Sequence, residues 1–131
     1  MLTGTCGNCG NQSSSTFIRG LSLGEIEFRD TFRGVVKEFL IALACGIALA
    51  VVNFAKLMIF DDSITWQMAL VISVTMICAV VFAKVVGSVL PVIAKKIGFD
   101  PAVMSSPFIS TIVDAVTLLI YFAIASSLLN L

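Results

Sequence analysis

Three long runs of apolar residues alternate with short polar segments along the chain. The first run extends from about residue 39 to 60, the second from 66 to about 94, and the third from 107 to 131. A bilayer core about 30 Å thick requires about 20 mostly apolar residues in a helix, so each run is long enough to cross it. A helix also satisfies its own backbone polar groups, which lipid cannot do. The pattern predicts an all-α, polytopic transmembrane helical bundle with three full spans.

Local signals predict the ends of these spans. The turn DDSIT after the first span offers Asp62 or Ser63 as the N-cap of the second. The second span has roughly 29 residues at about 1.5 Å each, so we expect it to tilt or to kink at Pro91. Lys95 and Lys96 follow it with the positive charges that suit a helix C-terminus.

The opening segment of the chain differs from all three runs. Residues 2–16, LTGTCGNCGNQSSST, are small, mostly polar and uncharged. In a chain this apolar, such a segment fits a helix that packs inside a bundle or faces a water-filled cavity, because small residues let helices approach closely and polar side chains avoid lipid. We therefore expect the C-terminal half of a preceding helix here. The alternative is an uncharged soluble loop.

Composition agrees with a membrane protein. Of the 131 residues, 59% are apolar or aromatic and 12% are charged, whereas an average soluble domain carries about 25% charged residues. Eight basic residues balance eight acidic ones, which excludes a nucleic-acid binder that relies on neutralising phosphates. The absence of histidine excludes histidine general bases and histidine metal ligands. We expect one membrane domain over residues 1–131, with the lipid bilayer as its surroundings.

The distribution of basic residues predicts an orientation. Six of the eight lie on one side of the predicted spans: Arg19, Arg29, Arg33, Lys37, Lys95 and Lys96. Only Lys56 lies near the opposite side. Basic loops stay in the cytoplasm of membrane proteins, so we expect this side to be cytoplasmic and the C-terminus to lie outside a cell's inner (plasma) membrane.

Asp114 is the only charged residue in the third run. It lies roughly 10 Å from the cytoplasmic end of the predicted helix. A carboxylate at this depth is costly unless it faces a cavity or a partner, so a functional role is the default hypothesis. Helical spacing places several hydroxyl groups on the same face of the helix: Ser106, Ser110, Thr111, Thr117 and Tyr121.

A carboxylate with hydroxyl groups, and without histidine, suits a hard cation such as magnesium. Magnesium retains several of its waters, so Asp114 and Ser110 could hold it through them. Two copies of Asp114 beside a two-fold axis would repel each other, and a divalent cation between them would stabilise both charged forms. The alternative is a non-conducting membrane assembly subunit in which Asp114 forms a structural pair with Lys84, about 16 Å from the same membrane boundary.

Cys6 and Cys9 form a C-G-N-C motif. A membrane thiol oxidoreductase using this motif would need a thioredoxin-like βαβ context, which the sequence does not predict. A zinc site would need a second pair, but Cys45 and Cys78 stand alone in apolar runs. We prefer to interpret the two cysteines as small buried helix residues and expect no enzymatic activity.

Two motifs in a fixed order carry a resemblance to a known family. One motif is Gly7-Asn8-Cys9-Gly10-Asn11-Gln12, followed by Arg19-Gly20-Leu21 and Leu23-Gly24-Glu25-Ile26. The other motif is Asp100-Pro101-Ala102, then Pro107, Thr111, Asp114 and Leu118-Leu119-Ile120-Tyr121-Phe122, with Gly87, Leu90 and Pro91 before it. The glycine-rich motif resembles the second transmembrane helix and following loop of MgtE-type magnesium channels. The aspartate-containing motif is similar to that family's fifth helix, preceded by the end of its fourth, so the resemblance covers essentially the whole chain.

The resemblance implies a homodimeric channel with five helices per subunit and a pore between the second and fifth helices at the subunit interface. It implies that hydrated Mg2+, with Mn2+ or Co2+ as other candidate ions, is selected between aspartates that match Asp114. The family's pore-lining positions fall here on Gly4, Gly7, Asn11, Val103, Ser106, Ser110, Asp114 and Thr117. The family's C-terminus is external, in agreement with the orientation expected from the basic residues.

The chain also departs from the family's pattern. It lacks the cytoplasmic N-terminal and CBS domains, the first helix and half of the second, so we do not expect magnesium-dependent closure by those domains. Thr117 stands where the family usually has glycine, and Ser106 where it has asparagine or glycine. A threonine on the pore wall could narrow the path or offer a further hydroxyl to hydrated ions.

Overall fold

The computed structural model describes residues 2–27, 29–103 and 106–130, apart from the side chain of Ser106. It contains four α-helices and one short 3-10 helix: α1 (Leu2–Ser22), α2 (Thr31–Phe60), α3 (Trp66–Lys96), η1 (Pro101–Val103) and α4 (Ser106–Leu129). The described residues contain no β-strand. The all-α prediction is confirmed.

Three helices, α2, α3 and α4, are long and apolar enough to cross a membrane, as the three apolar runs predicted. The polar opening segment forms helix α1, so its interpretation as a soluble loop is wrong. Among the described residues, α1 is not one of the helices that are long and apolar enough to cross a membrane. Helix α1 contacts α3 and α4.

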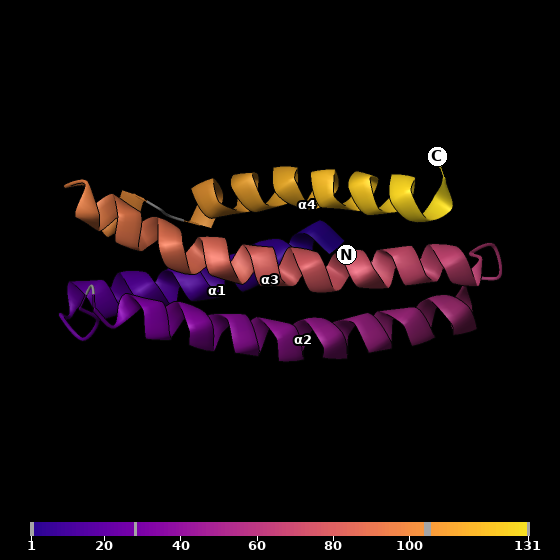
Figure 1. The fold of residues 1–131 in the computed structure, drawn as a ribbon, viewed down its shortest axis with the longest axis horizontal. Helices are drawn as coiled ribbons and strands as arrows, with labels where there is room; N and C mark the ends of the chain where they lie inside the picture. Colours follow the sequence, from indigo (N-terminus) through magenta and orange to yellow (C-terminus); the bar gives the residue numbers. More distant parts are fainter. Residues whose placement is uncertain (1, 28, 104–105, 131) are drawn as a thin grey trace.

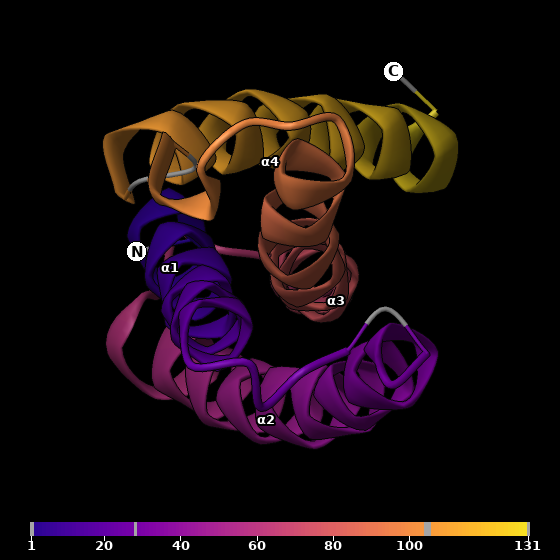
Figure 2. The same cartoon turned by 90° about the vertical axis from the view of Figure 1, so that its left-hand side faces the viewer.

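Helices α1 and α3 lie side by side between α2 and α4 (Figures 1 and 2). Helix α3 contacts the other three helices, and α1 also contacts α4. The main core contains buried side chains from all four helices, among them Cys6, Ala42, Met76 and Ile109. The core therefore lies along α3, with α1 fitted into the angle between α3 and α4.

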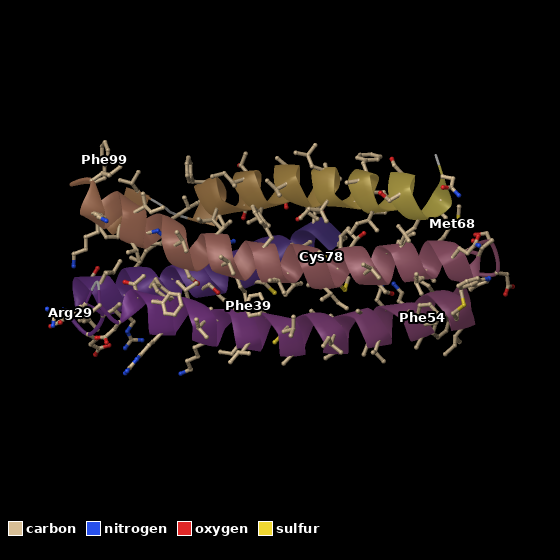
Figure 3. The ribbon with its side chains drawn as sticks, in the orientation of Figure 1. Arg29, Phe39, Phe54, Met68, Cys78 and Phe99 are labelled. Atoms are coloured by element: carbon tan, nitrogen blue, oxygen red, sulfur yellow. The ribbon has the colours of Figure 1, made fainter. Side chains whose placement is uncertain are left out.

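The two ends of the bundle carry different connections. Arg29, in the segment between α1 and α2, lies at the same end as Phe99, which follows α3, while Met68 lies near the other end (Figure 3). At the first end, the Lys95 ammonium donates a hydrogen bond to the carbonyl oxygen of Leu21 at 3.1 Å. The basic segment that precedes α2 and the basic end of α3 thus lie at the same end of the bundle, which the predicted orientation requires.

A close crossing joins α1 to α3 at two glycines. A Cβ atom added to Gly87 would overlap the carbonyl oxygen of Gly10. A Cβ atom added to Gly10 would lie 3.1 Å from a methyl carbon of Ile109 and 3.2 Å from the carbonyl oxygen of Ala83. Small residues let helix backbones approach in this way, so these two glycines set the separation of α1 and α3.

Two predicted helix ends are wrong. Helix α2 begins at Thr31, well before residue 39, because its charged first turns continue the helix beyond the apolar run. The N-cap of α3 is Thr65 rather than Asp62 or Ser63. Thr65 has the extended backbone of an N-cap, and its hydroxyl accepts a hydrogen bond from the Met68 amide at 3.4 Å. The Ser63 hydroxyl instead donates to the Asp61 carboxylate at 2.6 Å.

Pro91 lies inside α3, which continues to Lys96. The helix curves over its C-terminal part (Figure 1), where the proline removes one backbone hydrogen bond. The two lysines of its last turn are those predicted from the sequence.

Candidate cation site at the seam of α1 and α4

Asp114 lies in the middle of α4 and its side chain is partly exposed. One carboxylate oxygen, Oδ1, is buried and has no hydrogen-bond partner among the described residues. A buried acceptor without a donor is costly, and more so when it is charged. Water, a cation or a group from outside this chain would satisfy this oxygen.

Gly7 of α1 faces Asp114 directly. A Cβ atom added to Gly7 would lie 3.7 Å from Asp114 Oδ1 and equally 3.7 Å from Ser110 Oγ. Gly7 is buried, and because glycine has no side chain, a gap about the size of one methyl group remains beside both oxygens on the α1 side. The structure thus brings three of the predicted site residues together.

Asn11 completes the seam one turn along α1. Its side-chain Nδ2 donates a hydrogen bond to Ser110 Oγ at 3.0 Å. Its other side-chain atom, Oδ1, is buried and has no hydrogen-bond partner in the described structure. The seam therefore carries two unsatisfied side-chain oxygens, one from Asn11 and one from Asp114, on facing helices.

The alternative in which Lys84 pairs with Asp114 is wrong. Lys84 Nζ lies 3.1 Å from Glu38 Oε2 and forms the one salt bridge found among the described residues. Because α2 begins at Thr31, Glu38 lies within the helix bundle instead of marking the start of a span. Asp114 is left without a basic partner in the described part of the chain.

The atoms of Asn11, Ser110 and Asp114 that are suited to bind a metal ion are all oxygens. Magnesium prefers oxygen ligands and is usually held by one or two carboxylates together with waters. Within the described residues, no group of three or more acidic, cysteine or histidine side chains could hold a metal ion. One chain therefore offers a partial site, suited to a hydrated hard cation that a second carboxylate would help to hold.

The remaining predicted positions have different surroundings. Gly4 is exposed, and a Cβ atom added there would meet nothing within 4 Å. Val103 is 56% exposed in η1, whereas Thr117 is fully buried. The side chain of Ser106 lies outside the described residues.

Helix α1 also presents a polar surface of which the sequence analysis assigned only Asn11 to the site. An open hollow is lined by Asn8, Asn11, Gln12, Ser15 and Thr16. Their spacing of three and four residues is the signal that could have identified this face. Helix geometry places this face next to Gly7, so the polar surface extends from the seam toward the C-terminal end of α1.

Cys6 and Cys9 do not form a disulfide, and neither do Cys45 and Cys78. Cys6 is fully buried in the main core, and Cys9 is half-buried against it. These positions agree with small helix-packing residues.

Comparison with known proteins points to one family. The family model named MgtE, described as a divalent cation transporter, matches residues 1–124. Proteins named magnesium transporter MgtE are 35% identical in Enterococcus faecalis over 126 residues and 35% identical in Thermus thermophilus over 130 residues. The Bacillus subtilis protein of that name is 32% identical over 138 residues. The matches cover 96–99% of this chain but only 27–28% of each relative.

Proposed function

Because this chain belongs to the MgtE family of divalent cation transporters, we propose that it passes magnesium through a multi-pass membrane bundle, along a pore between two copies of the chain. The observation that carries the proposal is the buried, unsatisfied oxygen of Asp114, which faces Gly7 and so meets no side chain from α1 at that position. A hydrated magnesium ion would satisfy this oxygen because its waters donate hydrogen bonds.

Two copies of the chain are part of the proposal because one copy supplies a single carboxylate at the seam. Two Asp114 side chains facing each other would carry two negative charges, which one divalent cation balances. Without the cation, the two negative charges would repel each other. This charge match favours a divalent cation over a monovalent one.

Asn11 and Ser110 have supporting roles in this proposal. The Asn11–Ser110 hydrogen bond holds α1 and α4 together, and Asn11 Oδ1 accepts a hydrogen bond from a water of the ion. Gly4, Val103 and Ser106 remain proposed positions along the pore, whereas Thr117 is fully buried within one chain and is not proposed to line a pore between two copies. The C-terminus lies outside the cell in the proposed orientation, and Mn2+ and Co2+ are further candidate ions because they share the charge of Mg2+.

Flux into liposomes tests this function. Purified protein in liposomes that contain a magnesium-sensitive dye is expected to admit magnesium above the rate of protein-free liposomes. Asp114→Asn, which keeps the shape of the side chain and removes its charge, is expected to slow the flux about tenfold or more. Asp62→Asn changes an exposed carboxylate in the turn before α3 and is the matched control.

Two outcomes would contradict the proposed function. If folded wild-type protein gives no flux above protein-free liposomes, the alternative of a non-conducting assembly subunit is favoured. If Asp114→Asn and Asp62→Asn both conduct at the wild-type rate, Asp114 is not part of the ion path.

Gly7 offers a test of whether the ion passes beside Asp114 on the α1 side. A methyl group at this position would make ordinary van der Waals contact with Asp114 and Ser110, 3.7 Å away, so Gly7→Ala is expected to fold normally. The methyl group would displace water next to the carboxylate, and we expect magnesium flux to fall roughly tenfold. A Gly7→Ala protein with wild-type flux would mean that the ion does not pass this point.

A further inference from the structure

A buried polar cluster joins three helices on a different face of α1. The Lys84 ammonium donates to Glu38 Oε2 at 3.1 Å and to Ser13 Oγ at 3.4 Å. The Ser13 hydroxyl donates to the same Glu38 oxygen at 2.6 Å. Ser13, Glu38 and Lys84 belong to α1, α2 and α3 respectively, and we call them the three-helix cluster.

The three-helix cluster is not explained by stability alone. The Lys84 and Glu38 side chains are 8% and 13% exposed, and Ser13 is 1% exposed. The desolvation of a buried ion pair offsets most of its attraction, so apolar side chains of similar size would hold the helices together as well or better. The best-supported use of such a pair is to select one arrangement of helices over others.

Helix α1 is the helix that needs such selection. Its large buried apolar side chains, Phe17 and Leu21, lie near its C-terminal end and pack with Val92 of α3. Around Gly7 and Asn11 its residues are small or polar, so apolar packing specifies the position of that part less well. A shift by one residue moves a helix by about 1.5 Å and turns its side chains by about 100°. Such a shift would separate Ser13 from Glu38 and, two residues away, Asn11 from Ser110.

The three-helix cluster and the seam lie on the same short stretch of α1. Ser13 follows Gly7 by six residues, which places it about 9 Å along the axis and about 120° around it. Between them, Gly10 packs against Gly87 of α3 so closely that no side chain would fit between the two backbones. Because Gly7, Asn11 and Ser13 belong to one continuous helix, a shift that moves Ser13 also moves Gly7 and Asn11 relative to Asp114.

We propose that Ser13, Glu38 and Lys84 are positioning residues for the cation site, holding α1 in the register in which Gly7 and Asn11 face Asp114. This inference rests on the proposed function. When the cluster is lost, the α1 wall of the site shifts, and the hydrated ion binds less well. The magnesium concentration for half-maximal flux then rises more than the maximal rate falls.

Ser13→Ala and Ser88→Ala form a matched pair of variants for the test. Both serines are buried, but the Ser88 hydroxyl bonds only to the Lys84 carbonyl of its own helix, at 2.7 Å. In liposomes, Ser13→Ala is expected to raise the half-maximal magnesium concentration roughly fivefold. Ser88→Ala is expected to leave that concentration within about twofold of the wild-type value. Equal values for the two variants would overturn the inference.

A double variant separates register from stability. Glu38→Met combined with Lys84→Met replaces the buried pair by apolar side chains, so the thermal melting temperature in detergent is expected to equal or exceed that of the wild type. Its half-maximal magnesium concentration is nevertheless expected to rise roughly fivefold or more. A folded double variant with wild-type flux at every magnesium concentration would contradict a positioning role. If the double variant does not fold, Ser13→Ala decides the question.

The same assay tells failure of this inference from failure of the proposed function. If Asp114→Asn slows flux while Ser13→Ala behaves as wild type, the positioning role alone is wrong. If Asp114→Asn also conducts as wild type, the proposed function is wrong, and the positioning role is wrong with it.

Discussion

Cells that depend on this chain for magnesium are expected to lose uptake completely when Asp114 is replaced by alanine. The substitution removes the single charged group of α4 among its described residues, and with it the negative charge that each subunit brings to the proposed two-subunit site. A divalent cation that enters a low-dielectric region without compensating charge faces a barrier of many kcal/mol. Growth of a transport-deficient strain at limiting magnesium, together with direct magnesium uptake, measures the effect.

The substitution is also expected to leave the fold intact. The buried Oδ1 atom of Asp114 has no hydrogen-bond partner in the described structure, so alanine breaks no bond made by that atom and removes a desolvated oxygen. Equal amounts of Asp114→Ala and wild-type protein in the membrane, with equal melting temperatures in detergent, would separate loss of transport from loss of folding. Wild-type uptake by Asp114→Ala would rule out a role for this carboxylate.

Co-expression of the two forms tests whether two copies share one site. If subunits pair at random in equal amounts, about a quarter of the dimers carry two intact carboxylates. Uptake is then expected to fall to about a quarter of the wild-type level when mixed dimers are inactive. Independent subunits would instead retain about half of the uptake, since each intact subunit would work alone. Co-expression with Asp62→Ala is the control for expression level.

The sequence predicted the helices more reliably than the contacts between them. The apolar runs identified α2, α3 and α4, and small polar residues identified α1 as a helix within the bundle. Asp114 was identified as a candidate site residue because it is the single charged residue in its apolar run. The family resemblance was the one basis for placing Gly7 opposite the helix of Asp114, because no pattern in one helix shows which residues of another helix lie opposite it.

The three-helix cluster shows the limit of interpreting one span at a time. Glu38 lies next to an apolar run that begins at residue 39, so its charge places it outside the predicted span. The structure instead continues α2 to Thr31 and places Glu38 beside Lys84, 46 residues further along the chain. If the depth of each residue within the membrane is the sole criterion, Asp114 is the carboxylate that matches Lys84. Glu38 is overlooked because it is assigned to the region outside the span. Pairing of this kind depends on helix crossings, which local patterns do not specify.

The close crossing of α1 and α3 leads to the largest expected effect on folding. Gly87→Ala places a methyl group where the carbonyl oxygen of Gly10 lies. The Gly10 carbonyl is part of a helix backbone and cannot move away as the end of a flexible side chain can. The two helices must therefore separate. Added atoms in a packed interior cost about 3 kcal/mol at the upper end of the usual range. We expect Gly87→Ala to yield little monodisperse protein in detergent and a strongly lowered melting temperature.

Gly4→Ala is the matched control for this substitution. A Cβ atom at Gly4 meets nothing within 4 Å, and alanine favours a helix over glycine by up to about 1 kcal/mol. We therefore expect Gly4→Ala to be as stable as the wild type or slightly more stable. If Gly87→Ala melted at the wild-type temperature, α1 and α3 would have to lie further apart than the structure places them. Gly7 and Asn11 would then move with α1 away from Asp114, so the separation of two backbones at Gly10 and Gly87 is a condition for the cation site itself.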